Sequence, residues 1–148
     1  MRGKSVAILG ATGLVGGKVL QILETRRFPV ASLRLLATAR SAGVTIRAFG
    51  EEHRVEEARP ESFEGVDVCF FAGSAAAARD LAPEAVRRGA VVIDKSNAYR
   101  MDTDVPLVVP EVNAHTLRDH RGIIGSPNCS TIELVVVLKP IEDRAHIT

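Results

Sequence analysis

The residues with the clearest chemical potential lie near the end of the 148-residue chain, in the segment Ser126-Pro127-Asn128-Cys129-Ser130-Thr131. The apolar pair Ile123-Ile124 precedes this segment, and a second apolar run, 132–138, follows it. This pattern predicts a strand that ends before Cys129 and a helix that begins beside it. A thiol at a helix start faces free backbone N–H groups and the positive end of the helix dipole, which favour the nucleophilic thiolate. Cys129 is therefore the candidate nucleophile.

A glycine-rich turn near the amino terminus, Gly10-Ala11-Thr12-Gly13-Leu14-Val15-Gly16, is the second candidate site. It lies directly after the apolar run Ser5–Leu9 and directly before a helical pattern. In this context the first glycine permits a tight turn, the middle one lets the backbone approach a pyrophosphate, and the last lets the helix pack closely on the strand. The helix start then binds phosphate charge. The turn favours dinucleotide binding, and the alternative is a strand–helix turn that requires only a positive φ.

Arg40 follows the next expected strand, within Thr38-Ala39-Arg40-Ser41-Ala42-Gly43, a segment without any acidic residue. A fold that prefers NAD carries Asp or Glu near this point to bind the ribose 2′-hydroxyl. An arginine flanked by hydroxyl side chains suits a 2′-phosphate instead, because guanidinium pairs with phosphate through two hydrogen bonds. We therefore expect NADP rather than NAD as the cofactor. The alternative is an arginine in a solvated loop.

These candidate residues need elements to position them, and apolar strand-like runs alternate with helical patterns along the whole chain. We expect an α/β fold, a Rossmann-like, doubly wound and mostly parallel sheet in a three-layer α/β/α arrangement, with one NAD(P)-binding domain over residues 1–148. The expected strands are Ser5–Leu9, Leu33–Ala37, Val66–Ala72, Ala90–Ile93, Leu107–Val109 and Ile123–Ile124. Val44–Ala48 and Arg54–Ala58 are expected to form either a short hairpin or edge strands around Gly50. The expected helices are Leu14–Arg26 with Val15, Val19, Ile22 and Leu23 on its apolar face, Ser74–Arg88 kinked or divided at Pro83, Ala114–His120, and Ser130–Lys139 ended by Pro140.

The composition argues against several functional classes. A net charge of +1 and an aromatic content of 4% give no support for nucleic-acid binding. The apolar run Val6–Leu9 is too short for a signal sequence or a membrane span, so we expect a cytoplasmic protein without a membrane partner. The two cysteines have neither metal-ligand nor disulfide spacing, so no metal site is expected. Cys69 lies inside an apolar run and is expected to be buried and inert.

Several of these motifs together resemble the aspartate-semialdehyde dehydrogenase family. The matching segments follow the family's order and extend over essentially the whole chain. They are Gly10–Gly16, Arg40–Gly43, Asn97-Ala98-Tyr99-Arg100-Met101-Asp102, Val105-Pro106-Leu107-Val108-Val109-Pro110-Glu111-Val112-Asn113, and Pro127–Thr131. The last three motifs are specific, whereas the first is shared with many dinucleotide-binding proteins.

The resemblance implies an oxidoreductase of amino-acid biosynthesis, on the route to lysine, threonine and methionine. Such an enzyme reductively dephosphorylates L-aspartyl 4-phosphate to L-aspartate 4-semialdehyde with NADPH. The family's cysteine attacks the acyl phosphate, phosphate leaves, and a thioester forms. Hydride transfer then gives a thiohemiacetal that collapses to the aldehyde, so covalent catalysis divides one difficult step into easier ones. The implied small-molecule ligands are aspartyl phosphate and inorganic phosphate.

The resemblance also assigns roles to residues of this chain. Cys129 aligns with the nucleophile, Asn128 with the residue that orients the acyl group, and Arg100 with the arginine that binds phosphate. The remaining positions align with cofactor contacts: Gly10, Thr12, Gly13, Leu14 and Val15 with the pyrophosphate turn, Thr38, Arg40 and Ser41 with the 2′-phosphate pocket, and Ser74 with a further cofactor loop. Considered without the resemblance, Arg100 could be a surface cation paired with Asp102 and Asp104.

Two local departures and one large one accompany the resemblance. Lys95 stands where the family usually has Asn, and Gly125-Ser126 stands where Ala-Asn is common. Family members are far longer, and their second domain supplies a general acid/base histidine, further substrate contacts and most of a homodimer interface. None of those motifs is found in residues 1–148, and no local histidine can be assigned to replace the base. We expect this chain alone to bind cofactor but to turn over negligibly.

Two alternatives remain open at this point. One is a non-catalytic nucleotide-binding or subunit-interaction module derived from the family, which the presence of both Cys129 and Arg100 argues against. The other is an activity like that of the N-acetyl-glutamyl-phosphate reductases. That sister family typically has Gly at the position of Asn128 and Tyr at the position of Ser130, so these two residues favour the aspartyl branch.

Overall fold

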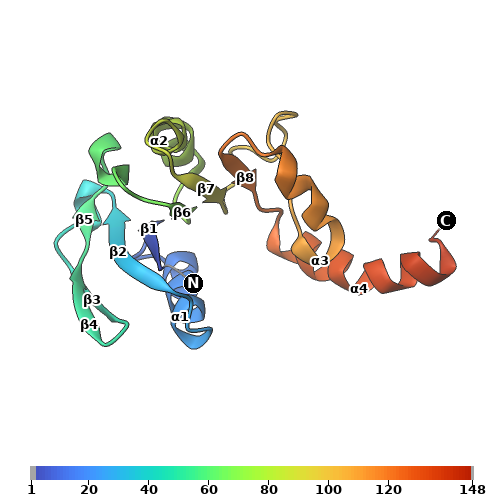
Figure 1. Cartoon of the computed structure of the whole chain (residues 1–148), viewed down its shortest axis with the longest axis horizontal. Coiled ribbons are helices and arrows are strands. Elements are labelled where there is room, and N and C mark those ends of the chain that lie inside the picture. Colours follow the sequence, from blue (N-terminus) through green and yellow to red (C-terminus); the bar gives the residue numbers. More distant parts are fainter. Residues whose placement is uncertain (1–2, 148) are drawn as a thin grey trace.

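A six-stranded sheet forms the centre of the computed structural model, which describes residues 3–147. All of its pairings are parallel, and the strand order is β5-β2-β1-β6-β7-β8 (Figure 1). The strands in that order are β5 (Glu56–Glu57), β2 (Val30–Ala37), β1 (Lys4–Leu9), β6 (Val68–Phe71), β7 (Val91–Asp94) and β8 (Ile123–Gly125). The consecutive side chains Val6, Ala7 and Ile8 are all 0% exposed, as expected of a strand covered on both faces. The predicted α/β fold class is confirmed.

Helices cover both faces of the sheet, because alternate side chains of each strand point to opposite sides. Val6 and Ile8 of β1 belong to the core cluster that includes Leu20 and Leu23 of α1 (Leu14–Thr25). Their neighbours Ala7 and Leu9 belong to the cluster that includes three alanines of α2 (Ala75–Arg87), namely Ala78, Ala82 and Ala85. Figure 1 shows α1 and α2 on opposite sides of the sheet. The architecture therefore has three layers.

A small antiparallel hairpin accompanies the sheet on the side of α1. It pairs β3 (Thr45–Ala48) with β4 (Glu51–Arg54) through the turn Phe49-Gly50, where both residues have positive φ. Each of the two predicted alternatives is confirmed in part: there is a hairpin around Gly50, but its second strand is Glu51–Arg54, and the segment Arg54–Ala58 contains an edge strand. Glu56–Glu57 instead pairs with β2 as the edge of the main sheet, a place where charged residues are well tolerated.

The buried face of α1 agrees only in part with the predicted one, since Leu23 is buried and Val19 packs against the same core cluster. Val15 and Ile22 are 45% and 43% exposed, whereas Gly16, Leu20 and Leu23 are buried. The cause is Gly16, whose lack of a side chain lets the helix lie against the preceding turn and thereby fixes which face turns inward.

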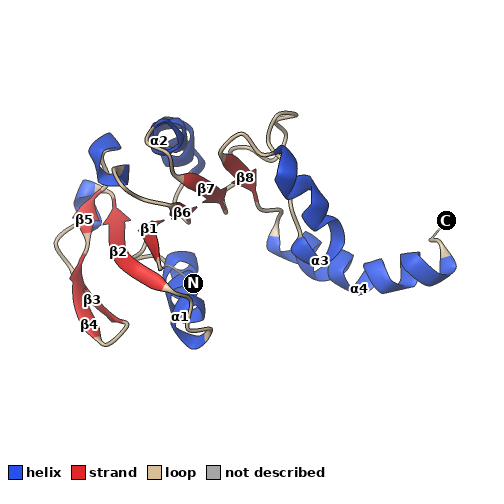
Figure 2. Ribbon diagram, in the orientation of Figure 1, coloured by secondary structure: helices blue, strands red, loops and turns tan. Residues whose placement is uncertain are grey.

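The last helix, α4 (Cys129–Ala145), extends past Pro140, so the prediction that Pro140 ends it is wrong. Around and after Pro140, Lys139 pairs with Asp143 and His146 contacts Glu142, each four residues apart along the helix. No described residue of α4 is buried, and Figure 2 shows the helix leading away from the sheet.

Two shorter predictions between β7 and β8 need correction. Leu107–Val109 does not form a strand; only Leu107 pairs with Gly125, in an isolated parallel bridge. The flanking Pro106 and Pro110 lack the N–H donors that a longer ladder requires, and Pro110 begins the short helix α3 (Pro110–Asn113). The segment predicted as an α-helix from 114 to 120 is a 3₁₀ helix, Ala114–Asp119.

Pro83 was predicted to kink or divide the helix over 74–88. It lies within the helix α2, which continues from Ala75 to Arg87 without interruption.

Candidate active site

The carboxyl ends of five neighbouring strands lie in one row. The register pairs Leu36 of β2 with Leu9 of β1, Leu9 with Phe71 of β6, Phe71 with Asp94 of β7, and Asp94 with Gly125 of β8. Each predicted site segment lies in the loop or turn that follows one of these strands. Ligands of open parallel sheets bind along this edge, so the fold gathers all the candidate residues where a ligand is expected.

The glycine-rich turn has the geometry that a phosphate requires. Gly10 has φ +83°, and a Cβ at Gly10 would lie 2.8 Å from the Ala72 carbonyl oxygen. A Cβ at Gly16 would overlap the carbonyl oxygen of Gly10, so this glycine lets α1 pack against the turn. α1 begins after Gly13 without a side-chain cap or an acidic residue in its first turn. Its free backbone N–H groups therefore suit an anion.

A groove of about 230 Å³ lies between the ends of β1, β2 and β6. At β1 and β6 the order of the strands changes direction along the sheet, which is where dinucleotides bind in folds of this kind. Of the predicted cofactor residues, those that line the groove are Gly10, Thr12, Gly13, Thr38, Ser41 and Ser74. The sequence reasoning missed Leu9, Ala37, Ala72 and Gly73, whose signal is their place at or just after a strand end, and Ala77, which lies in the first turn of α2.

The other predicted cofactor residues lie outside the groove lining. Leu14 and Val15, in the first turn of α1, are 92% and 45% exposed. Arg40 is exposed in the short 3₁₀ helix Ala39–Ser41, next to the lining residue Ser41. Ser74 has a structural role as well, because its hydroxyl accepts a hydrogen bond from Ala77 N at 3.2 Å and caps α2.

Arg100 is held by main-chain oxygens from two loops. Its Nε donates to the Ser126 carbonyl at 3.1 Å, and its Nη2 donates to the Lys95 carbonyl at 3.2 Å. The alternative of a surface cation paired with Asp102 and Asp104 is not what the structure shows. Asp102 pairs with Arg79, and Asp104 pairs with Arg121 at 3.7 Å. Arg100 therefore ties the loop after β7 to the loop after β8.

Cys129 is the first residue of α4 and is exposed. Asn128 precedes it as the helix cap, with Oδ1 accepting from Ser130 N at 3.0 Å. The same Oδ1 lies 3.9 Å from the Cys129 Sγ. Because Ser126 and Pro127 are buried, the thiol stands on an anchored loop. Cys69, in contrast, is buried in β6, and burial raises the pKa of its thiol well above the usual range.

Lys95 is a neighbour of this site that the sequence reasoning noted only as a departure. Its Nζ donates to the Ser126 Oγ at 2.8 Å, across 31 positions of sequence. Burial lowers the pKa of Lys95, and the charge of Arg100 lowers it further, while Cys129 acts in the opposite direction. Its position directly after a buried strand was the feature of the sequence that could have marked Lys95 as a candidate site residue.

The histidines take part in other contacts. His120 Nδ1 accepts from Gly122 N at 3.0 Å, and His146 pairs with Glu142 near the end of α4. Within residues 3–147, no three His, Cys, Asp or Glu side chains lie close enough to hold a metal ion. No helix of that same range is long and apolar enough to cross a membrane.

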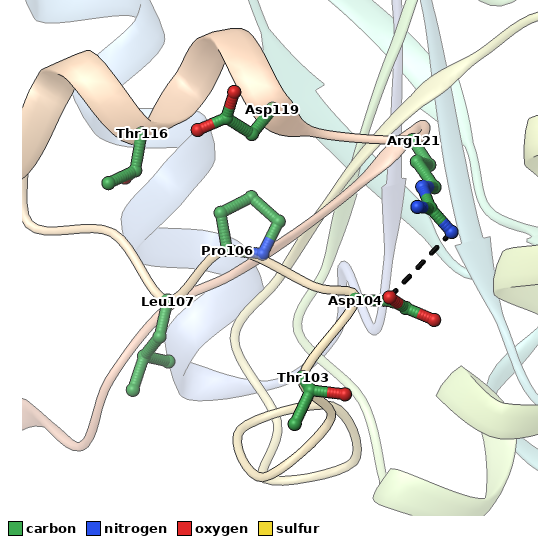
Figure 3. A pocket seen from close by; sticks show the side chains of 7 residues that line it. All are labelled: Thr103, Asp104, Pro106, Leu107, Thr116, Asp119 and Arg121. Carbon is green, nitrogen blue, oxygen red and sulfur yellow. Dashed lines mark ion pairs between the residues drawn. The ribbon is translucent and has the colours of Figure 1, made fainter.

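A second hollow, of about 340 Å³, contains none of the predicted site residues (Figure 3). Its lining comes from the loop before α3 and from the 3₁₀ helix 114–119, and the Asp104–Arg121 ion pair lies at its side. It contains neither a cysteine nor a glycine-rich turn, so the row of strand ends remains the candidate active site.

Comparison with known proteins identifies the family of the chain. Residues 5–120 match the protein family described as semialdehyde dehydrogenase, NAD binding domain. The chain belongs to this family. The resemblance to aspartate-semialdehyde dehydrogenases is confirmed by a Bacillus subtilis enzyme of that name, which is 53% identical over 140 residues. That match covers 95% of this chain and 40% of the relative.

Solved structures of the family have the same fold. Aspartate semialdehyde dehydrogenase II from Vibrio cholerae, complexed with ASA, superposes with a TM-score of 0.95 at 43% identity, covering 99% of this chain and 48% of that one. The Candida albicans enzyme with NADP superposes with a TM-score of 0.79 at 30% identity, covering 98% of this chain and 48% of that one. The chain thus spans less than half the length of these relatives.

Proposed function

We propose that this chain is the cofactor-binding part of an NADP-dependent aspartate-semialdehyde dehydrogenase. The observation that carries the proposal is the row of strand ends, which places the glycine-rich turn, Arg100 and Cys129 along one edge of the sheet. A turn suited to phosphate, a cation and a thiol are the parts needed to reduce an acyl phosphate through a thioester. The relatives that bear this enzyme name support the choice of substrate.

The groove residues fit a dinucleotide. Gly10 and Gly13 carry no side chain that would project into the groove they line, and the start of α1 has no acidic group to repel a pyrophosphate. Thr38, Arg40 and Ser41 would hold the 2′-phosphate at the end of β2, and Ser74 and the exposed Leu14 and Val15 would contact the cofactor from the other strand ends. When bound, NADPH supplies the hydride that reduces the thioester to the aldehyde level.

The chain's own residues account for acylation. The thiolate of Cys129 attacks the carbonyl carbon, a C–S bond forms, and the C–O bond to phosphate breaks with release of inorganic phosphate. Arg100 offers guanidinium N–H groups to the phosphoryl oxygens, and Asn128 orients the acyl group beside the thiol. When the C–S bond later breaks, the sulfur takes up a proton. Because no contact joins Cys129 to a histidine within residues 3–147, we propose that residues outside this range supply the general base.

Cofactor binding is tested by thermal unfolding with NADP or NAD. We expect NADP to raise the melting temperature more than NAD, since ligand at 100 times its Kd stabilises by about 2.7 kcal/mol. In Arg40→Ala the advantage of NADP is lost while the effect of NAD stays. If neither nucleotide stabilises the chain at millimolar concentration, the proposal is wrong.

The nucleophile is tested separately with acetyl phosphate as a small acyl phosphate. We expect mass spectrometry to find one acetyl group, released by hydroxylamine and located on Cys129. Cys129→Ser must abolish the label, and Arg100→Gln must slow it. A label on Cys69, or none in the unaltered chain, contradicts the assignment.

A further inference from the structure

Two cations beside the candidate nucleophile lack a carboxylate partner. Nine ion pairs join side chains of residues 3–147, and neither Lys95 nor Arg100 takes part in any of them. Both side chains are half-buried, and both contact Ser126, three positions before Cys129. The nearest acid in sequence, Asp94, is fully buried and accepts hydrogen bonds from Ser96 N and Oγ instead.

Both cations are fixed in place but keep free donors. A lysine ammonium has three N–H groups, and the one bond of Lys95 goes to Ser126 Oγ. A guanidinium has five N–H groups, and Arg100 uses two of them for the carbonyls of Ser126 and Lys95. Ser126 itself is only 7% exposed, so the residue that holds both side chains is anchored in the protein.

Two half-buried like charges raise the energy of the folded chain unless an anion compensates them. The charged groups that act on Lys95 are Arg100, which disfavours its protonated form, and the Cys129 thiolate, which favours it. No carboxylate of residues 3–147 pairs with either cation. One thiolate carries a single negative charge against two cations, so the cluster also suits an anion supplied by a ligand.

We propose that Lys95 is a second phosphate-binding residue that acts together with Arg100 on the phosphoryl group of the substrate. The proposal rests on the function proposed above and deepens it, because it adds a second residue to the phosphate site. Lys95 stands where the family usually has Asn. In this chain the acyl phosphate would meet two cations instead of one. Lys95 also orients the approach to Cys129 through Ser126.

The test is a titration of the 148-residue chain with inorganic phosphate, in which the shifts of the amide NMR signals measure the Kd. Every variant carries Cys129→Ser, so that titration of the thiol does not contribute. We expect Lys95→Gln to weaken the phosphate Kd about tenfold, since one charge-assisted hydrogen bond is lost. Lys95→Arg keeps the charge and should stay within about threefold. Unchanged shifts away from the site show that each variant is folded.

The pH profile adds a second readout. Because the pKa of Lys95 lies below its usual range, phosphate binding should weaken as the pH rises from about 7 to about 10, whereas Lys95→Arg should show no such loss. Equal Kd values for the unaltered lysine and Lys95→Gln, with binding lost in Arg100→Gln, overturn the role of Lys95 and leave the proposed function standing. If phosphate does not bind even when both cations are present, the phosphate-binding roles of Lys95 and of Arg100 are both wrong. The NADP titration tests the cofactor claim independently.

Discussion

The guanidinium carbon of Arg79 lies 4.4 Å from the centre of the Tyr99 ring. The same guanidinium pairs with Asp102, and the Tyr99 hydroxyl donates to the Ala78 carbonyl at 3.2 Å. Both contacts fasten the segment after β7 to α2. Arg100 lies between the two anchored residues Tyr99 and Asp102, so this arrangement positions the guanidinium that we propose binds phosphate.

Removing the Tyr99 hydroxyl should weaken that anchor without removing the ring. We expect Tyr99→Phe to lower the free energy of unfolding by about 1 kcal/mol, the usual contribution of one hydrogen bond, as measured by urea denaturation. Tyr99→Leu also removes the cation–π contact and should cost more. If Tyr99→Phe and Tyr99→Leu are equally stable, the ring is not part of the anchor.

Cys69 should make the chain less stable in alkali. Burial raises the pKa of its thiol in the folded state, so its contribution is fully present below the ordinary thiol pKa of about 8.5. This stability is lost progressively as the pH rises from there toward the folded-state pKa. In a Cys129→Ser background, Cys69→Ala should flatten the fall in unfolding free energy between about pH 8 and about pH 10. Parallel curves for the two proteins would show that Cys69 is not the cause.

The two adjacent glycines of α1 give a matched pair of variants. Gly16→Ala forces a Cβ against the Gly10 carbonyl oxygen and should cost about 1–3 kcal/mol, together with loss of NADP binding. Gly17→Ala meets nothing within 4 Å and should stabilise the helix by about 0.5–1 kcal/mol with binding unchanged. Thermal unfolding with and without NADP measures both effects. Similar behaviour of the two variants would contradict the close approach at Gly16.

Two variants of Asn128 should distinguish its effect on helix stability from its effect on the reactivity of the Cys129 thiol. Asn128→Ala removes the acceptor for Ser130 N and should cost about 1 kcal/mol. Asn128→Asp keeps an acceptor at the helix start and should retain stability. Its negative charge beside Sγ should nevertheless slow alkylation of Cys129 by iodoacetamide, because it disfavours the thiolate. Alkylation at an undiminished rate in Asn128→Asp would show that the side chain does not act on the thiol.

The sequence predicted the sheet well because central parallel strands are buried on both faces and appear as continuous apolar runs. It also predicted that Cys129 begins a helix and that Cys69 is buried. Two features were not predictable from the local sequence pattern. These are which side chains of α1 are buried and the extension of α4 beyond Pro140. The first depends on how Gly16 meets Gly10, and for the second the structure shows only that the helix is continuous from Cys129 to Ala145.

The contact between Lys95 and Ser126 could not be read from the sequence either. It joins residues 31 positions apart, and it exists because Asp94 and Gly125 are register partners in adjacent strands. The role of Arg100 came from family resemblance, whereas its two carbonyl partners became known only with the fold.

The parallel register also sets the shape of any ligand that uses the whole edge. From β1 to β8 there are three strand spacings, or about 14 Å at ~4.8 Å each. A molecule held by its phosphates at the end of β1 must therefore stretch across β6 and β7 before its reactive end approaches the thiol. The spacing of the strands therefore favours an elongated ligand and determines which part of that ligand arrives at Cys129.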